Sequence, residues 1–160
     1  MTYQEFNRER QNNLNRLPIR WAFGEEQLDK VLEDWGITRN EMIDKCRPLA
    51  GGIYLKSEQP LVDEILSKDE EYRDKLHRLM EEDEDFAVDA FYYEMCNHEY
   101  FLDYYEGDYN VCECFGNCEY GDFKDYRDYL SECEYSEKVA QSFRKAMKKH
   151  LKEAEENGWY

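Results

Sequence analysis

The sequence lacks any long apolar run. No stretch approaches the roughly 20 consecutive apolar residues that a membrane-spanning helix requires, and the segment from Met1 to Phe6 has no basic stretch followed by an apolar one. We therefore expect neither membrane insertion nor export, and we place the chain in the cytoplasm. In that reducing compartment the six cysteines are expected to be thiols or metal ligands rather than disulfides.

The sequence also lacks the short motifs of common enzyme chemistry. It has no phosphate-binding glycine loop, no dinucleotide fingerprint and no serine nucleophile elbow. His98-Glu99 begins a zinc-protease pattern, but Leu102 stands where the second histidine is required. The order of carboxylates from Asp103 to Asn110 is not that of an EF-hand loop. We therefore predict that the protein is not an enzyme.

Basic residues are few relative to acidic ones. The chain has 21 lysines and arginines against 38 aspartates and glutamates, which gives a net charge of −17. Hydrophobic residues still account for 41% of the sequence, more than a disordered chain contains. Because 160 residues is about the size of one ordinary domain, and no long linker or internal repeat is visible, we expect a single compact domain over residues 1–160.

Apolar periodicity predicts a mainly α fold (α+β) of about six helices with a small short-stranded β element. Gly36 is expected to end a helix that begins after Gly24, and Thr38 with Glu41 matches a capping box. The glycine turn at 51–52 predicts a strand directly after it, and a short strand also fits residues 109–115. The longest expected helices span about residues 2–15, 25–35, 57–80, 86–100 and 136–157.

The negative charge is concentrated in one part of the chain. Residues 81–135 hold 2 basic and 18 acidic residues, and ten of the fourteen tyrosines. We call this segment the acidic region. Its first residues, the acidic run at 81–85, are expected to mark a helix junction, because carboxylates stabilise the N-terminus of a following helix. A brief helix is expected over residues 122–130.

The acidic region is the candidate partner-binding surface. Carboxylates three or four residues apart can match the spacing of nucleic-acid phosphates, and tyrosines supply rigid contact area of the kind enriched at binding hot spots. The alternative is a solvated acidic surface that only confers solubility. The residues predicted to contact a partner are Asp103, Tyr104, Tyr105, Glu106, Asp108, Tyr109, Asp122, Asp125, Tyr126, Asp128 and Tyr129.

The cysteines provide a second candidate site. Four thiolates, or three with the imidazole of His98, are a donor set that holds tetrahedral zinc. Their spacing is not that of a standard zinc knuckle, so free thiols are the favoured interpretation, and a catalytic thiol is disfavoured in acidic surroundings. The basic final helix also leaves a homodimer open. The zinc hypothesis names Cys112, Cys114, Cys118 and Cys133 as ligands.

Three short stretches carry a resemblance to a known family. They are the segment 17–23 with Glu26-Gln27, the glycine turn Gly51 to Tyr54 followed by Lys56, and the segment 91–94 leading to 97–100. Together they are similar to short, acidic, uncharacterised proteins from Firmicutes and their phages or mobile elements, over residues 3–110. That family has no assigned activity, so the resemblance implies a biological setting and no catalytic residues.

The function expected from these observations is inhibition of a host nucleic-acid-binding protein by an acidic surface that imitates nucleic acid. Small acidic proteins of mobile elements often act against host nucleases, which is an analogy that does not depend on fold. The expected partner is a defence protein of the host bacterial cytoplasm, such as a CRISPR or restriction effector, and no direct nucleic-acid binding is expected. The alternative function is a zinc-stapled protein–protein adaptor without such mimicry.

Overall fold

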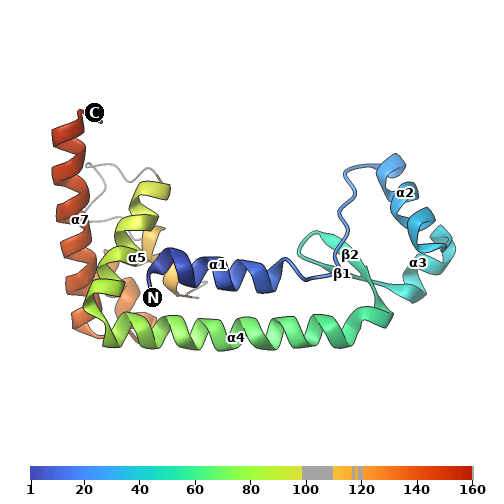
Figure 1. Ribbon diagram of the computed structural model, residues 1–160, viewed down its shortest axis with the longest axis horizontal. Helices are drawn as coiled ribbons and strands as arrows, with labels where there is room; N and C mark the ends of the chain where they lie inside the picture. Colours follow the sequence, from blue (N-terminus) through green and yellow to red (C-terminus); the bar gives the residue numbers. More distant parts are fainter. Residues whose placement is uncertain (99–109, 117, 119–120, 160) are drawn as a thin grey trace. The chain divides into compact units, whose positions relative to one another are not determined.

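Helices make up most of the structure, and the only sheet in the described part of the chain is a two-stranded antiparallel one. The computed structural model describes residues 1–98, 110–116, 118 and 121–159 (Figure 1). The predicted mainly α class is confirmed, with more helices than expected. The elements are α1 (Tyr3–Leu14), α2 (Glu25–Trp35), α3 (Arg39–Lys45), β1 (Cys46–Leu49), β2 (Gly52–Leu55), η1 (Lys56–Glu58), α4 (Gln59–Glu82), α5 (Glu84–Asn97), η3 (Asn110–Phe115), α6 (Tyr126–Glu132) and α7 (Glu137–Asn157).

The chain forms two compact units. Unit 1 comprises residues 1–9 and 72–160, and unit 2 comprises residues 10–71. The single domain expected over 1–160 stays a prediction. Within the described residues, none of the helices combines the length and the apolar character that crossing a bilayer demands.

Unit 2 contains the helix ends that the sequence predicts. Gly36 follows α2 with a left-handed φ of 67°, and its N–H donates to the carbonyls at the end of that helix. Thr38 and Glu41 form the expected capping box at the start of α3, each side chain accepting from the other residue's backbone N–H. These signals are local, so they fix the helix ends without help from the rest of the fold.

A β-hairpin follows α3. β1 pairs with β2 from Cys46 opposite Leu55 to Leu49 opposite Gly52, and the two residues between the strands, Ala50 and Gly51, both have positive φ. Such a two-residue turn matches the twist of paired strands. A Cβ atom added at Gly52 would lie 2.8 Å from the carbonyl oxygen of Arg20. The backbone around Arg20 therefore passes too close to β2 for a side chain at this position. The predicted strand after the glycine turn is confirmed; β1 was not predicted.

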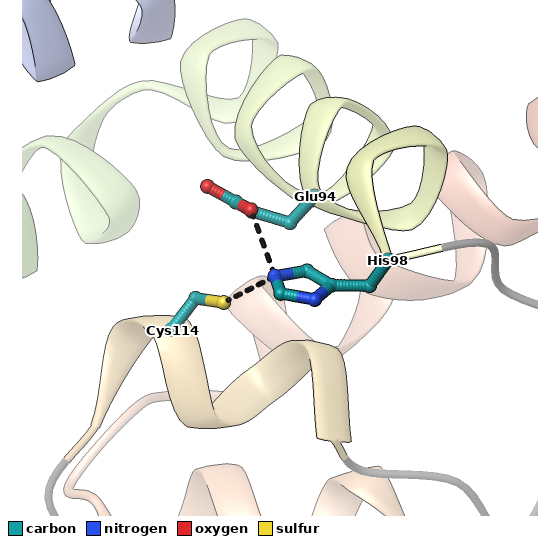
Figure 2. Close-up of side chains that lie close together, drawn as sticks. All are labelled: Glu94, His98 and Cys114. Carbon is teal, nitrogen blue, oxygen red and sulfur yellow. Dashed lines mark hydrogen bonds and ion pairs between the residues drawn. The ribbon is translucent and has the colours of Figure 1, made fainter.

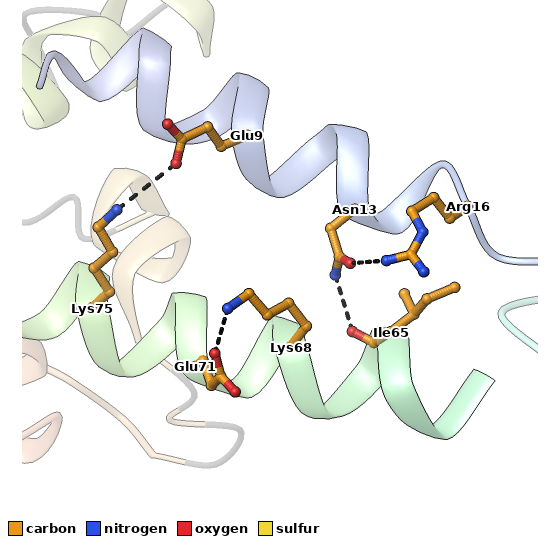
Figure 3. Close-up of polar contacts among 7 residues, drawn as sticks. All are labelled: Glu9, Asn13, Arg16, Ile65, Lys68, Glu71 and Lys75. Carbon is orange, nitrogen blue, oxygen red and sulfur yellow. Dashed lines mark hydrogen bonds and ion pairs between the residues drawn. The ribbon is translucent and has the colours of Figure 1, made fainter. Parts of the chain in front are cut away.

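Within unit 2, polar contacts join the end of α1 to the first half of α4. The buried amide of Asn13 on α1 donates to the carbonyl of Ile65 on α4, and Arg16 donates to the Asn13 side-chain oxygen (Figure 3). One turn earlier on α1, Arg10 makes a bidentate pair with the buried carboxylate of Asp69, at 2.6 and 3.0 Å. The Asn13 amide and the Asp69 carboxylate are both buried, and a buried polar or charged group is stable only when it is hydrogen-bonded.

Unit 1 is built around a large aromatic core. α5 and α7 lie side by side, and every residue of the main hydrophobic cluster belongs to unit 1 (Figure 1). The ring of Phe91 on α5 lies 4.8 Å from that of Phe115 and 5.2 Å from that of Phe143 on α7. The short strand that fitted residues 109–115 is wrong, since 110–115 form the 3-10 helix η3. Its turn brings Val111, Cys112 and Phe115 to one buried side.

The acidic run marks a helix junction, as predicted. α4 ends at Glu82, and Asp83 caps α5 by accepting a 3.0 Å hydrogen bond from the N–H of Phe86. The carboxylate of Glu81 accepts from both the backbone N–H and the hydroxyl of Ser136, directly before α7. Carboxylates in these places satisfy donors that a helix start leaves unpaired. Part of the acidic excess therefore builds the fold.

Candidate functional site

The predicted partner-binding residues fall into two groups, one outside the described residues and one around α6. The first group lies outside the described residues, so its part in binding stays a prediction; it comprises Asp103, Tyr104, Tyr105, Glu106, Asp108 and Tyr109.

The three aspartates of the second group do not form a row on one helix. Asp125 is the N-cap of α6 and accepts from the N–H groups of Arg127 and Asp128, at 2.9 and 3.1 Å. Asp128 lies inside the helix and accepts from the N–H of Lys124 at 3.2 Å. Asp122 precedes the helix and is exposed. Two of the three carboxylates therefore stabilise the start of α6, which begins later than the expected residue 122.

Tyr126 and Tyr129 are core residues, which corrects their prediction as contact residues. Tyr126 is 6% exposed and stacks on Phe143 with ring centroids 4.3 Å apart. Tyr129 is 1% exposed, and its hydroxyl donates to the carbonyl of Gly116. Burial raises the pKa of Tyr129 above its ordinary value. The spacing of these tyrosines with Leu130 is that of a buried helix face, a signal that the surrounding charges obscured.

Exposed carboxylates remain along the described acidic region. They come from the end of α4, the first turn of α5, η3 and the two sides of α6, and they include Glu82, Asp85, Glu113, Asp122 and Glu132. Glu84 forms an ion pair with Lys145 of α7. The described acidic surface is therefore smaller than the count of acidic residues suggests, but it keeps its excess of negative charge.

The four predicted zinc ligands are not brought together as one donor set. Cys112 is fully buried in the hydrophobic core. Cys118 Sγ lies 2.7 Å from Cys133 Sγ, and a side chain on Gly116 would overlap the Cys133 sulfur. Burial, with Cys118 close by, raises the pKa of Cys133 to about 12. Among the described residues, only one group has donor atoms close enough together to hold a metal ion. Of the four predicted cysteines, it contains Cys114 alone.

That group consists of Glu94, His98 and Cys114 (Figure 2). Glu94 lies on α5, and His98, four residues after Glu94, directly follows the end of that helix. Cys114 comes from η3. His98 Nε2 lies 3.3 Å from Glu94 Oε2 and 3.5 Å from Cys114 Sγ. Burial, together with the Glu94 carboxylate, raises the pKa of the Cys114 thiol to about 12. An oxygen, a nitrogen and a sulfur donor therefore converge on one point.

Glu94 is held in place by its neighbours. It is 6% exposed, and the hydroxyl of Tyr3 donates to its Oε1 at 2.7 Å. Asn97 donates to Oε2 at 3.4 Å. Sequence reasoning pointed to His98 and Cys114 but missed Glu94. The available signal was its separation of four residues from His98, which places both side chains on one side of a helix.

These features define a mainly helical protein with one small hairpin, an acidic surface and a buried carboxylate facing an imidazole and a thiol. The chain belongs to a family of unknown function (DUF7659), whose model matches residues 2–153. The match includes most of α7, which lies beyond the stretches that carried the resemblance. No curated protein and no solved structure matches the chain. Membership indicates neither a source nor an activity, so the expected phage setting remains a proposal.

Proposed function

We propose that this protein inhibits a nucleic-acid-binding protein by occupying that partner's basic surface with its acidic region. The observation that carries the proposal is the excess of 16 negative charges over residues 81–135, with 18 acidic residues against 2 basic ones. A surface of this charge attracts lysine- and arginine-rich grooves and repels nucleic acid itself. The partner we propose is a bacterial defence protein such as a CRISPR or restriction effector.

The described carboxylates with no role in capping support this proposal most directly. Asp122 and Glu132 lie on either side of α6, and Glu82 ends α4. α6 packs on α7 through buried Tyr126, which stacks on Phe143, so Glu132 at its end is held by an ordered helix, as is Glu82 at the end of α4. Charges held in place lose less entropy on binding than charges on a flexible segment.

The proposed binding is electrostatic and therefore sensitive to salt. Attraction between exposed charges is screened over about 8–10 Å at physiological ionic strength. Complementary charge mainly accelerates encounter, so association should be fast at low salt and slow markedly as salt is raised. If the acidic surface served only solubility, no partner with this salt dependence would be found.

The test is capture of candidate effectors by the tagged full chain, at low and high salt, with and without competing DNA or RNA. The proposal predicts that a nucleic-acid-binding protein is recovered at low salt and released by either competitor or salt. Capture that is indifferent to nucleic acid would contradict mimicry and favour the adaptor function. Failure to capture any purified effector from these classes would leave the acidic surface as a solubility feature only.

A further inference from the structure

We propose that Glu94, His98 and Cys114 form a binding site for a first-row transition metal of the zinc type. The three residues lie in unit 1: Glu94 on α5, His98 directly after its end, and Cys114 on η3. The donor set differs from the four cysteines expected from the sequence. Its three residues lie within the acidic region, but none is among the exposed carboxylates on which the inhibitor function rests, so the two proposals can be tested separately.

The spacing of the donors fits a tetrahedral metal with little rearrangement. Ligand atoms bound to zinc at about 2.0–2.3 Å lie about 3.3–3.8 Å from one another in a tetrahedron. The separations in the protein are 3.3 Å between Glu94 Oε2 and His98 Nε2, and 3.5 Å between His98 Nε2 and Cys114 Sγ (Figure 2). All three ligand atoms lie within 4.8 Å of one another. A small shift of the Cys114 sulfur toward Glu94 would complete the site.

The surroundings of Glu94 match those of a metal-binding carboxylate. Tyr3 donates to Oε1 and leaves Oε2 directed toward His98 and Cys114. Carboxylate ligands are commonly oriented by a hydrogen bond to the oxygen that does not bind the metal. Tyr3 is itself buried against Phe86 and Phe115, so its hydroxyl is fixed by the aromatic core. The orientation of Glu94 is therefore set before any metal arrives.

The chemistry of the donors selects the metal. A thiolate and an imidazole favour zinc and its neighbours in the first transition row over Ca²⁺ and Mg²⁺, which take oxygen ligands. Binding would displace the thiol proton of Cys114 to solvent and give a site with one sulfur, one nitrogen and one oxygen donor. Among the residues that the structure describes, these three supply the ligands, one fewer than the four of a purely structural zinc site.

A metal here would join the end of α5 to η3. His98 follows the last turn of α5, and Cys114 lies in the 3-10 helix that packs on that helix. Because the three donors are brought together only in the folded state, a metal bound to them shifts the folding equilibrium toward that state. The expected consequence is a gain in thermal stability that depends on metal concentration.

The experiment uses the full chain, reduced, treated with chelator and dialysed, and titrated with Co²⁺ as a probe that is visible by absorption. We expect one Co²⁺ per chain, with a thiolate-to-cobalt charge-transfer band, displaced by one equivalent of Zn²⁺, and a rise in melting temperature with either ion. Absence of that band, or more than one equivalent of tight binding, would overturn the proposal.

Variants identify the ligands. His98→Asn changes a side chain that is 53% exposed, so the fold should survive, and we expect at least a tenfold loss of Co²⁺ affinity. Cys114→Ser should abolish the charge-transfer band. The matched control is Cys96→Ser, an exposed thiol outside the site, which should bind like the parent. Loss of the band in Cys118→Ser or Cys133→Ser, with Cys114→Ser unaffected, would place the metal on the other cysteine pair and overturn the proposal.

Discussion

The two units of this protein use their charged residues differently. Unit 2 has 9 basic and 13 acidic residues, and four of its arginines pair with carboxylates of the same unit. Unit 1 has 12 basic and 25 acidic residues, and it holds the whole of the main hydrophobic cluster. Charge in unit 2 therefore helps to connect its elements, whereas unit 1 is held by its core and has carboxylates to spare. We infer that unit 1, with an excess of 13 acidic residues against 4 in unit 2, supplies most of the charge that a partner would meet.

Removing an aromatic ring from the core should have the largest effect on stability. Phe143 is fully buried between Phe91 and Tyr126, so Phe143→Ala should lower the free energy of unfolding by about 3–5 kcal/mol, measured by urea denaturation. The matched control in unit 2 is Phe23→Ala, whose side chain is 85% exposed and which should change stability little. Similar losses for both variants would show that the core does not dominate unit 1.

Breaking the buried ion pair of unit 2 should rank second. Asp69 is 5% exposed and accepts two hydrogen bonds from Arg10. Asp69→Ala leaves the arginine without this partner, and we expect a loss of about 2–4 kcal/mol in urea denaturation. Glu64→Gln, which alters the exposed pair with Arg16, should cost about 1 kcal/mol or less. A small effect at Asp69 would contradict the view that ion pairing organises unit 2.

Removing a helix cap from the acidic region should have a smaller effect. Asp83→Ala deletes the bond to the N–H of Phe86 and should lower stability by about 1 kcal/mol. Asp85→Ala removes an equal charge in the first turn of the same helix without removing a capping bond. It should cost only a few tenths of a kcal/mol, roughly the value of a dipole interaction. Equal costs at the two positions would mean that charge, and not capping, stabilises α5.

Features governed by short-range rules could be predicted from the sequence. The left-handed glycine at 36, the capping box of Thr38 and Glu41, and the final helix ending before Gly158 each depend on neighbouring residues alone. β1 was missed because Pro48 disfavours a strand, and only pairing with β2 makes it one.

The site residues were harder to predict because their roles depend on distant contacts. The sequence gives the charge of Asp125 but not its use as an N-cap, and it gives the tyrosines of α6 but not the packing on Phe143 that buries Tyr126. Cys114 meets Glu94 only because η3 folds back on α5, across a separation of twenty positions that no local pattern reports. The order of the cysteines alone suggested a different donor set.

The most direct test of the account compares charge removal in the two units. One triple variant neutralises exposed carboxylates of the acidic region, Glu82→Gln, Asp122→Asn and Glu132→Gln. The control neutralises three exposed carboxylates of unit 2, Glu26→Gln, Glu33→Gln and Asp44→Asn. Both variants lose the same net charge and leave the caps Asp83 and Asp125 intact.

The measurement is the affinity of each triple variant for the captured partner at low and physiological salt. The account predicts about a tenfold loss for the acidic-region variant at low salt, from roughly 0.5 kcal/mol per exposed charge, and a smaller loss as salt is raised. The unit 2 variant should bind nearly as well as the parent protein. Equal losses for the two variants would contradict the claim that unit 1 supplies most of the charge that a partner meets.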